Sequence, residues 1–131
     1  ERFKAFKGRC DIRYVKTDGV SLPGISDASV TFVYSWDSMV HCDKTVIEKY
    51  MEEFARVMKP GAKGFIHHTD YGARDVVQDI DSAPHFRSNM SKGEFARQAA
   101  KYGLLVTRQD LLDWADEPSL DCISQFQKPA R

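Results

Sequence analysis

Hydrophobic and polar residues follow several distinct patterns along the first part of the chain, and each pattern predicts an element of secondary structure. Residues 10–15 (CDIRYV) alternate apolar with polar side chains, which predicts a half-buried strand. Residues 16–29 are rich in Gly, Pro, Ser and Asp and predict a loop. The nearly continuous apolar run at 30–36 (VTFVYSW) predicts a strand covered on both faces, in the centre of a parallel sheet.

The pattern then changes to helical spacing. Apolar residues recur every three or four positions from Lys44 to Met58, which predicts a long amphipathic helix. Asp43 is expected to cap its amino end, and the segment KPGAKG to end it, because proline cannot continue a helix and glycine permits the reversal. Residues 64–68 (GFIHH) predict a short buried strand, so that strand, helix and strand form a βαβ unit.

A long polar and aromatic connection follows at residues 69–89. Connections of this length are typical of lids and binding loops, and a short helix is expected near residues 73–80. Ser91 and Glu94 then form a capping box, which predicts a helix that ends at Gly103.

The end of the chain has the pattern of two strands. Residues 104–110 and 121–127 are strand-like and are joined by a turn-rich segment that contains residues 117–119, which predicts an antiparallel pair that closes the sheet. The whole pattern predicts an α/β fold in one domain, with parallel strands, helices and a C-terminal antiparallel strand pair.

The charge balance argues against a polyanionic partner. The 131 residues include 19 basic and 19 acidic ones, so the chain lacks the basic excess typical of nucleic-acid and anionic-membrane binding. No apolar run approaches the roughly 18 residues that span a bilayer, and the start ERFKAFKG has no apolar signal-peptide core. We therefore expect a soluble, cytoplasmic protein without a nucleic-acid or membrane partner.

Cysteine and histidine spacing argues against a metal site. Cys10, Cys42 and Cys122 are widely spaced and form no CxxC pair, which suggests reduced thiols rather than a disulfide framework or a zinc site. His67 and His68 are adjacent on the predicted strand, so their side chains should point to opposite faces and cannot chelate one ion together.

One long phrase, DASVTFVYSWDSMVHCDKTVIEKYMEEFARVMKPGAKGFIHH, resembles class I S-adenosylmethionine-dependent methyltransferases from their third strand onward. Residues 56–62 reproduce the family's Arg-Val-Leu-Lys-Pro-Gly-Gly type turn, with alanine in place of one glycine. The resemblance implies a partial Rossmann-like methyltransferase sheet, and the C-terminal strand pair agrees with it.

The resemblance also implies that residues 1–131 form a single truncated domain. The family's first strand, its GxGxG cofactor loop and the acidic residue after its second strand would all precede residue 1. A domain derived from a small-molecule methyltransferase but inactive or incomplete alone is therefore expected, with doubtful binding of S-adenosylmethionine. The alternative is a non-catalytic α/β association module. Because the missing first strand would pair with strand 30–36, this module would dimerise through that exposed edge.

The resemblance places candidate cofactor contacts in two segments. Asp18, followed by Gly19, lies where the family has a carboxylate that accepts a hydrogen bond from the adenine amino group; an ordinary Asp-Gly turn is the alternative. Ser35, Trp36 and Asp37 follow the predicted central strand, where ligands bind in open α/β sheets. Strand-end packing and capping is the alternative for these three residues.

Candidate catalytic and acceptor contacts lie in the loops. His41 follows the same strand, and an imidazole that titrates near neutral pH can remove a proton from a methyl acceptor; a surface or capping histidine is the alternative. His68, Tyr71 and Arg87 are candidate contacts to a small-molecule acceptor, with Arg87 pairing a carboxylate or phosphate. For the long connection, a partly ordered surface loop is the alternative.

Overall fold

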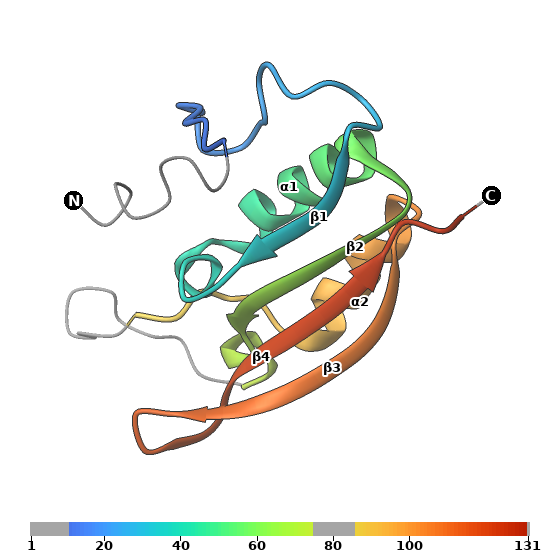
Figure 1. The fold of residues 1–131 in the computed structure, drawn as a ribbon. Helices are drawn as coiled ribbons and strands as arrows, with labels where there is room; N and C mark the ends of the chain where they lie inside the picture. The colour runs from blue at the N-terminus through green and yellow to red at the C-terminus, as the bar shows by residue number, and fades with distance from the viewer. Residues whose placement is uncertain (1–10, 75–85, 131) are drawn as a thin grey trace.

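The computed structural model describes residues 11–74 and 86–130 (Figure 1). The strands are β1 (Val30–Ser35), β2 (Met58–Thr69), β3 (Leu105–Trp114) and β4 (Glu117–Gln127). The helices are α1 (Lys44–Val57) and α2 (Lys92–Lys101), with short 3-10 helices η2 (Met39–His41) and η3 (Tyr71–Ala73). In the described part of the chain, no helix is long and apolar enough to span a membrane.

The four strands form one mixed sheet in the order β1-β2-β4-β3. β1 runs parallel to β2, whereas β4 pairs antiparallel with both β2 and β3. Both long helices lie behind the sheet in Figure 1, so they cover one face. The predicted α/β fold, its βαβ unit and its C-terminal antiparallel pair are therefore confirmed.

The core lies between the sheet and the two helices. The Phe126 ring of β4 packs 6.1 Å from the Phe54 ring of α1 and 6.0 Å from the Phe95 ring of α2, measured between ring centroids. Ile66 of β2 is fully buried in the same cluster. Gly64 leaves room for Phe126, because a Cβ atom at this position would lie 2.2 Å from the Phe126 ring.

The predicted helix ends are confirmed. The Asp43 carboxylate accepts a hydrogen bond from the Thr45 backbone N–H and caps α1. The Ser91 hydroxyl accepts from the Glu94 N–H and caps α2. Gly103 follows α2 with φ +75°, a left-handed conformation that favours glycine.

The predicted strand at 10–15 is wrong over the residues that the structure describes. Residues 11–15 have no regular structure, and Ile12, Tyr14 and Val15 are exposed; Cys10 lies outside the described residues. The alternation of side chains was correct for a strand, but a strand also needs a hydrogen-bonded neighbour, which local sequence does not specify. The helix expected near 73–80 falls mostly outside the described residues, and the structure shows η3 at its start.

β1 is an edge strand, not the predicted central one. Among the described strands only β2 pairs with it, and the side chains of Phe32 and Tyr34 are 56% and 62% exposed. Its apolar run suggested cover on both faces, yet the helices cover one face only. The positions at the sheet centre belong to β2 and β4.

Two strands are longer than predicted. β2 begins at Met58 directly after α1, and Gly61 bends it with φ +80° while its N–H bonds to the Lys128 carbonyl. Residues 117–119 lie in β4 rather than in the turn, which is formed by Ala115 and Asp116, both with positive φ. Pairing with neighbouring strands therefore extends the sheet through residues that favour turns.

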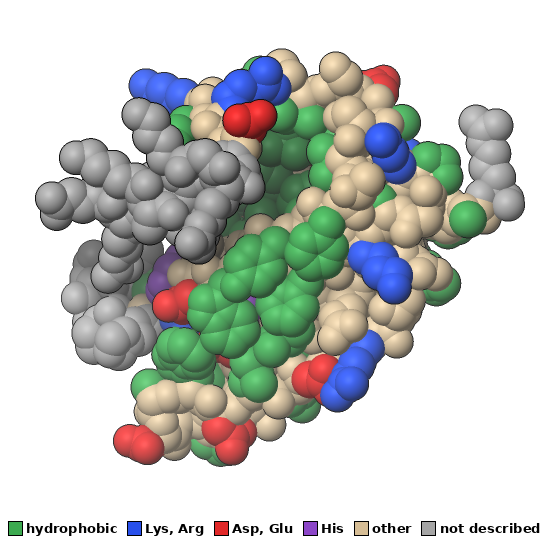
Figure 2. Space-filling model, viewed as in Figure 1, with side chains coloured by type: hydrophobic (Ala, Val, Ile, Leu, Met, Phe, Trp, Pro, Cys, Tyr) green, Lys and Arg blue, Asp and Glu red, His purple; other side chains and the backbone are tan. Residues whose placement is uncertain are grey.

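The sheet face opposite the helices, called the open face below, carries a cluster of aromatic side chains (Figure 2). The Phe65 ring of β2 stacks against the rings of Tyr34 and Trp36, with centroids 5.6 and 6.3 Å away. Trp36 also contacts Trp114 of β3 edge to face. The apolar residues that suggested a doubly covered strand therefore form an exposed aromatic surface.

Candidate functional site

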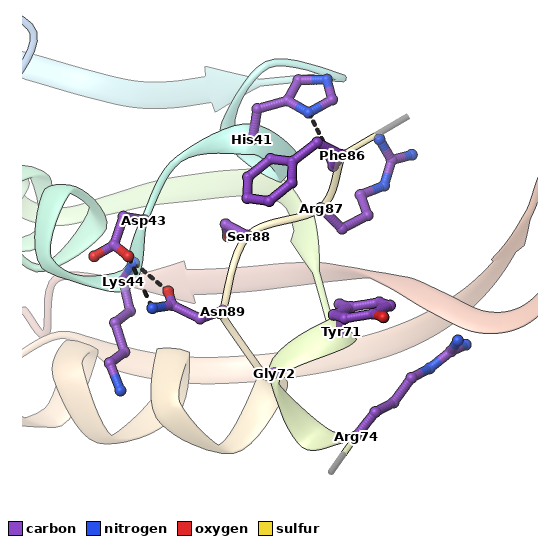
Figure 3. A pocket seen from close by; sticks show the side chains of 10 residues that line it. All are labelled: His41, Asp43, Lys44, Tyr71, Gly72, Arg74, Phe86, Arg87, Ser88 and Asn89. Carbon is purple, nitrogen blue, oxygen red and sulfur yellow. Dashed lines mark hydrogen bonds between the residues drawn. The ribbon is translucent and has the colours of Figure 1, made fainter. Parts of the chain in front are cut away.

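A pocket of about 460 Å³ lies where the chain leaves the carboxyl ends of β1 and β2 (Figure 3). Ligands of open α/β sheets bind at this edge. Three segments line the pocket: His41, Asp43 and Lys44 after β1; Tyr71, Gly72 and Arg74 after β2; and Phe86, Arg87, Ser88 and Asn89 before α2. The predicted catalytic residue and two predicted acceptor contacts, Tyr71 and Arg87, are therefore brought together.

His41 has a defined ring orientation in this pocket. Its Nδ1 atom lies within hydrogen-bond distance of the Phe86 carbonyl oxygen (Figure 3). A carbonyl oxygen can only accept, so Nδ1 carries the proton and Nε2 is the unprotonated nitrogen of the neutral ring. The arrangement gives His41 a basic nitrogen that could accept a proton from a bound molecule.

Hydrogen bonds join the segment after β1 to the segment before α2. The Asn89 side chain accepts from the Lys44 N–H at 2.9 Å and donates to the Asp43 carboxylate at 2.8 Å (Figure 3). The Ser88 N–H donates to the Val40 carbonyl. The wall of the pocket is thereby tied to the amino end of α1, which Asp43 caps.

Arg87 is directed into the protein, so its predicted pairing with an acceptor is corrected. Its guanidinium donates to both carboxylate oxygens of Asp121 at 2.9 and 2.8 Å, and the residue is only 3% exposed. Sequence reasoning missed Asp121, which lies 34 residues away on β4, because no local motif marks such a pair.

Asp121 is also bound by a histidine. The Nε2 atom of His67 lies 3.2 Å from Oδ2 of Asp121. Burial alone would raise the pKa of Asp121, but the hydrogen bonds from His67 and Arg87 outweigh burial, so the pKa is lowered and the carboxylate is charged at neutral pH.

His68 lies in the core, which corrects its predicted role in acceptor binding. The ring is fully buried, stacks 4.4 Å from the Phe95 ring and bonds to the Ser124 hydroxyl at 2.8 Å. Burial lowers the pKa of His68 to about 4, so the ring is neutral at physiological pH. It packs under α2, whereas His67 lies on the open face, as predicted for adjacent strand residues.

The residues after β1 contact His67. Trp36 is 43% exposed and lies 4.5 Å from the His67 ring, centroid to centroid. Asp37 has φ +49° and donates its backbone N–H to Nδ1 of His67 at 3.2 Å. Ser35 pairs with Ile66 in the sheet. The structure thus shows strand-end packing for Ser35, Trp36 and Asp37, and their contact with a cofactor stays a prediction.

The other predicted cofactor segment contacts a different part of the chain. The Asp18 carboxylate accepts hydrogen bonds from the Val20 and Ser21 N–H groups, and these hydrogen bonds lower its pKa. Gly19 has φ +87°, as an Asp-Gly turn requires. The loop continues to Leu22, whose N–H bonds to Glu53 of α1. The structure thus shows a turn here, and contact of Asp18 and Gly19 with a cofactor stays a prediction.

Two basic side chains of the pocket differ in their contacts. Arg74 pairs with Glu117 at 2.9 Å and lies over the Tyr71 ring, 5.4 Å from its centroid. Lys44 forms no ion pair with the residues that the structure describes. Lys44 is therefore the basic side chain of the pocket that no carboxylate of the described residues neutralises, and Asp43 is the one acidic residue among those that line the pocket.

Residues 1–66 match the model of a protein family described as a methyltransferase domain. This match covers half of the chain, so the chain belongs to that family. Its fold is that of class I S-adenosylmethionine-dependent methyltransferases, as the resemblance predicted. No curated protein matches the chain significantly.

Solved structures agree on the fold. The PH0226 protein of Pyrococcus horikoshii OT3 is 18% identical with a TM-score of 0.66, over 97% of this chain and 64% of that one. Geranyl diphosphate C-methyltransferase of Streptomyces coelicolor A3(2) is 13% identical with a TM-score of 0.71, over 97% and 58%. A putative methyltransferase of Haloferax volcanii, solved with the Trm112 methyltransferase activator, is 18% identical with a TM-score of 0.61, over 98% and 67%. The chain thus spans roughly three fifths to two thirds of the length of these proteins.

Proposed function

We propose that this chain forms the acceptor-binding part of an S-adenosylmethionine-dependent small-molecule methyltransferase and is incomplete as an enzyme by itself. The observation that carries the proposal is the hydrogen bond between His41 and the Phe86 carbonyl on the pocket wall. It leaves Nε2 of His41 as the basic nitrogen at the sheet edge where ligands of this fold class bind.

The proposed role of His41 is to accept a proton from the methyl acceptor. Transfer of a methyl group from the sulfonium of S-adenosylmethionine to a hydroxyl or amine would break a sulfur–carbon bond and form a carbon–oxygen or carbon–nitrogen bond, and the acceptor would have to lose its proton. Nε2 of His41 takes that proton and the ring becomes imidazolium. Phe86 keeps the ring oriented throughout, because its carbonyl accepts from Nδ1 in both protonation states.

The described residues fit S-adenosylmethionine only in part. Trp36 and Asp37 offer an exposed ring and an exposed carboxylate at the end of β1. The Asp18 carboxylate, however, accepts hydrogen bonds from its own loop, and no GxGxG turn occurs in the 131 residues. The chemistry proposed for this chain is therefore confined to the acceptor.

Lys44 favours an acceptor with an anionic group, because no carboxylate of the described residues pairs with it. Arg87 is committed to Asp121 and Arg74 pairs with Glu117, so Lys44 is the proposed contact for a carboxylate or phosphate, with the Tyr71 ring in the same pocket. An anion near the amino end of α1 would also be stabilised by the helix dipole.

NMR titration of the full chain tests this proposal. The probes are benzoate, phenyl phosphate and neutral benzamide, with shifts followed at His41, Tyr71 and Asn89. The two anions should bind and benzamide should not, and Lys44→Gln should weaken the anions several-fold. Lys49→Gln, an exposed residue elsewhere on α1, is the matched control. Equal binding of all three probes, or of none, would contradict an anion-selective pocket.

Incompleteness has its own test. Calorimetry of the chain with S-adenosylmethionine should give weak binding or none. Methyl transfer from labelled S-adenosylmethionine at an ordinary enzymatic rate by the 131-residue chain alone would refute this part of the proposal.

A second candidate function is association of two chains through β1. The strand lies at the sheet edge and carries no charge and no proline, two features that commonly prevent edge pairing. Its exposed Phe32 and Tyr34 side chains would become buried in a symmetric antiparallel pair.

Sedimentation of variants tests the association. Tyr34→Lys should convert the proposed dimer to a monomer, because a charge on β1 opposes pairing. Leu105→Lys on β3, at the other edge and 52% exposed, should leave the dimer intact. A monomeric parent chain at all concentrations would exclude this function.

A further inference from the structure

A buried polar cluster of His67, Arg87 and Asp121 lies on the open face of the sheet. No long helix among the described residues covers this face, yet His67 and Asp121 are fully buried and Arg87 is 3% exposed. Two indole rings cover the cluster: the ring centroids of Trp36 and Trp114 lie 4.5 and 5.5 Å from that of His67, and the Arg87 guanidinium lies 5.7 Å from the Trp114 centroid.

The hydrogen bonds of this cluster form a directed chain. The Asp37 N–H donates to Nδ1 of His67, so Nε2 carries the ring proton of the neutral histidine and donates to Asp121. Arg87 donates two further hydrogen bonds to the same carboxylate. One carboxylate on β4 thereby holds three segments: the residues after β1, the end of β2 and the segment before α2.

Two of these segments carry the groups proposed to act in the pocket. His41 lies four residues after Asp37, and Phe86 directly precedes Arg87. The hydrogen bond between His41 Nδ1 and the Phe86 carbonyl joins the two segments at the pocket. Asp121 does not line the pocket, so it can influence His41 only through the backbone that it anchors.

We propose that Asp121 is a positioning residue for His41: through His67 and Arg87 it fixes two segments so that the His41 ring keeps its Nδ1–H tautomer on the Phe86 carbonyl. This inference rests on the proposed function, because the tautomer matters for catalysis only if Nε2 of His41 takes a proton from the acceptor. The anchor itself is a property of the folded chain without cofactor or acceptor.

A matched pair of variants separates positioning from general stability. Asp121→Asn keeps the size of the side chain but removes its charge and one acceptor. Ser124→Ala is the control, because Ser124 lies on the same strand, is equally buried and bonds to His68 on the opposite face of the sheet. Both variants lose a buried polar contact, but only the first loosens the segments that carry His41 and Phe86.

The measurement is the ¹⁵N NMR spectrum of the histidine rings at a pH where His41 is neutral. In the parent chain His41 should show a protonated Nδ1 and an unprotonated Nε2. In Asp121→Asn it should shift to mainly Nε2–H, the form that free histidine prefers, and in Ser124→Ala it should not change. Fluorescence of Trp36 and Trp114, the only tryptophans in the sequence, verifies folding around the cluster.

A milder variant keeps the test decisive if Asp121→Asn does not fold. Arg87→Lys retains the charge but cannot donate two parallel hydrogen bonds, so the His41 tautomer should shift partly in the same direction. An unchanged His41 ring in a folded Asp121 or Arg87 variant, or an equal change in Ser124→Ala, would overturn the inference. A shifted tautomer combined with no binding of benzoate or phenyl phosphate would support the positioning and refute the proposed pocket function instead.

Discussion

His67 and His68 are neighbours on β2, yet their rings belong to two different environments on opposite faces of the sheet. His68 stacks 4.4 Å from Phe95 under α2, whereas His67 lies 4.5 Å from Trp36 on the open face. One ring is part of the apolar core and the other is part of a buried ionic cluster. The two histidines should therefore affect stability and site geometry separately.

The stability of the fold should fall in acid because of His68. Burial lowers its pKa from 6.5 to about 4, so between these values the unfolded chain binds more protons than the folded one. The unfolding free energy is therefore unaffected by the titration of His68 above pH 6.5 and falls progressively toward pH 4, by up to about 3 kcal/mol. Urea unfolding between pH 4 and 8 measures it.

His68→Gln supplies the comparison for that experiment. Glutamine does not titrate, so the decrease in unfolding free energy between pH 6.5 and 4 should be smaller by the same amount. A variant with an unchanged pH slope would show that another group causes the loss.

Gly64→Ala should destabilise the core, because its Cβ atom would lie 2.2 Å from the Phe126 ring. The ring is enclosed by Phe54 and Phe95, so it cannot move without repacking, at a cost of about 1–3 kcal/mol. Gly93→Ala is the control: nothing lies within 4 Å of its Cβ, and in α2 alanine should stabilise by about 0.5–1 kcal/mol. Thermal unfolding of both variants measures the contrast, and equal melting temperatures would contradict it.

The helices could be predicted because their signals are local. Asp43 and Ser91 cap the helices that follow them, and Gly103 ends α2, all within one or two turns of the apolar pattern. The position of a strand in the sheet depends on distant partners instead. The same kind of pattern therefore predicted a strand at 10–15, of which residues 11–15 pair with no strand in the described structure, and a central place for β1 although it lies at the edge.

The candidate site was predicted in outline for the same reason. His41 and Tyr71 line one pocket because the loops after parallel strands meet at one sheet edge. The direction of Arg87 could not be read from the sequence, since it is set by Asp121 on β4. His68 faces the core because of the register between β2 and β4, which a single sequence does not give.

Arg56 should hold the loop before β1 against α1. Its guanidinium donates to the Ile25 and Leu22 carbonyls at 2.8 and 3.2 Å and pairs with Glu53 at 2.8 Å. Arg56→Ala should lower stability by about 1–2 kcal/mol and raise hydrogen exchange in residues 22–27. The control is Arg97→Ala, which removes an exposed ion pair with Glu94 in α2 and should lower stability by less than about 1 kcal/mol. An equal loss of stability in the Arg56 and Arg97 variants would show that the contacts of Arg56 with the two carbonyls contribute nothing.

Asp43 and Asn89 should be energetically coupled, because one carboxylate both caps α1 and accepts from the amide of the pocket wall at 2.8 Å. Asp43→Ala should cost about 1–2 kcal/mol, since a cap and a second hydrogen bond are lost together. Asn89→Ala should cost about 1 kcal/mol through its bonds to Asp43 and Lys44. In the double variant the shared bond is lost only once, so the combined cost should fall short of the sum by about 0.5 kcal/mol or more. Chemical unfolding of the four chains measures this difference. The control is the same cycle between Asp43 and Arg97, which share no contact in the described structure. Their costs in unfolding free energy should add within about 0.5 kcal/mol. Additivity in both cycles would mean that the wall of the pocket is not tied to α1.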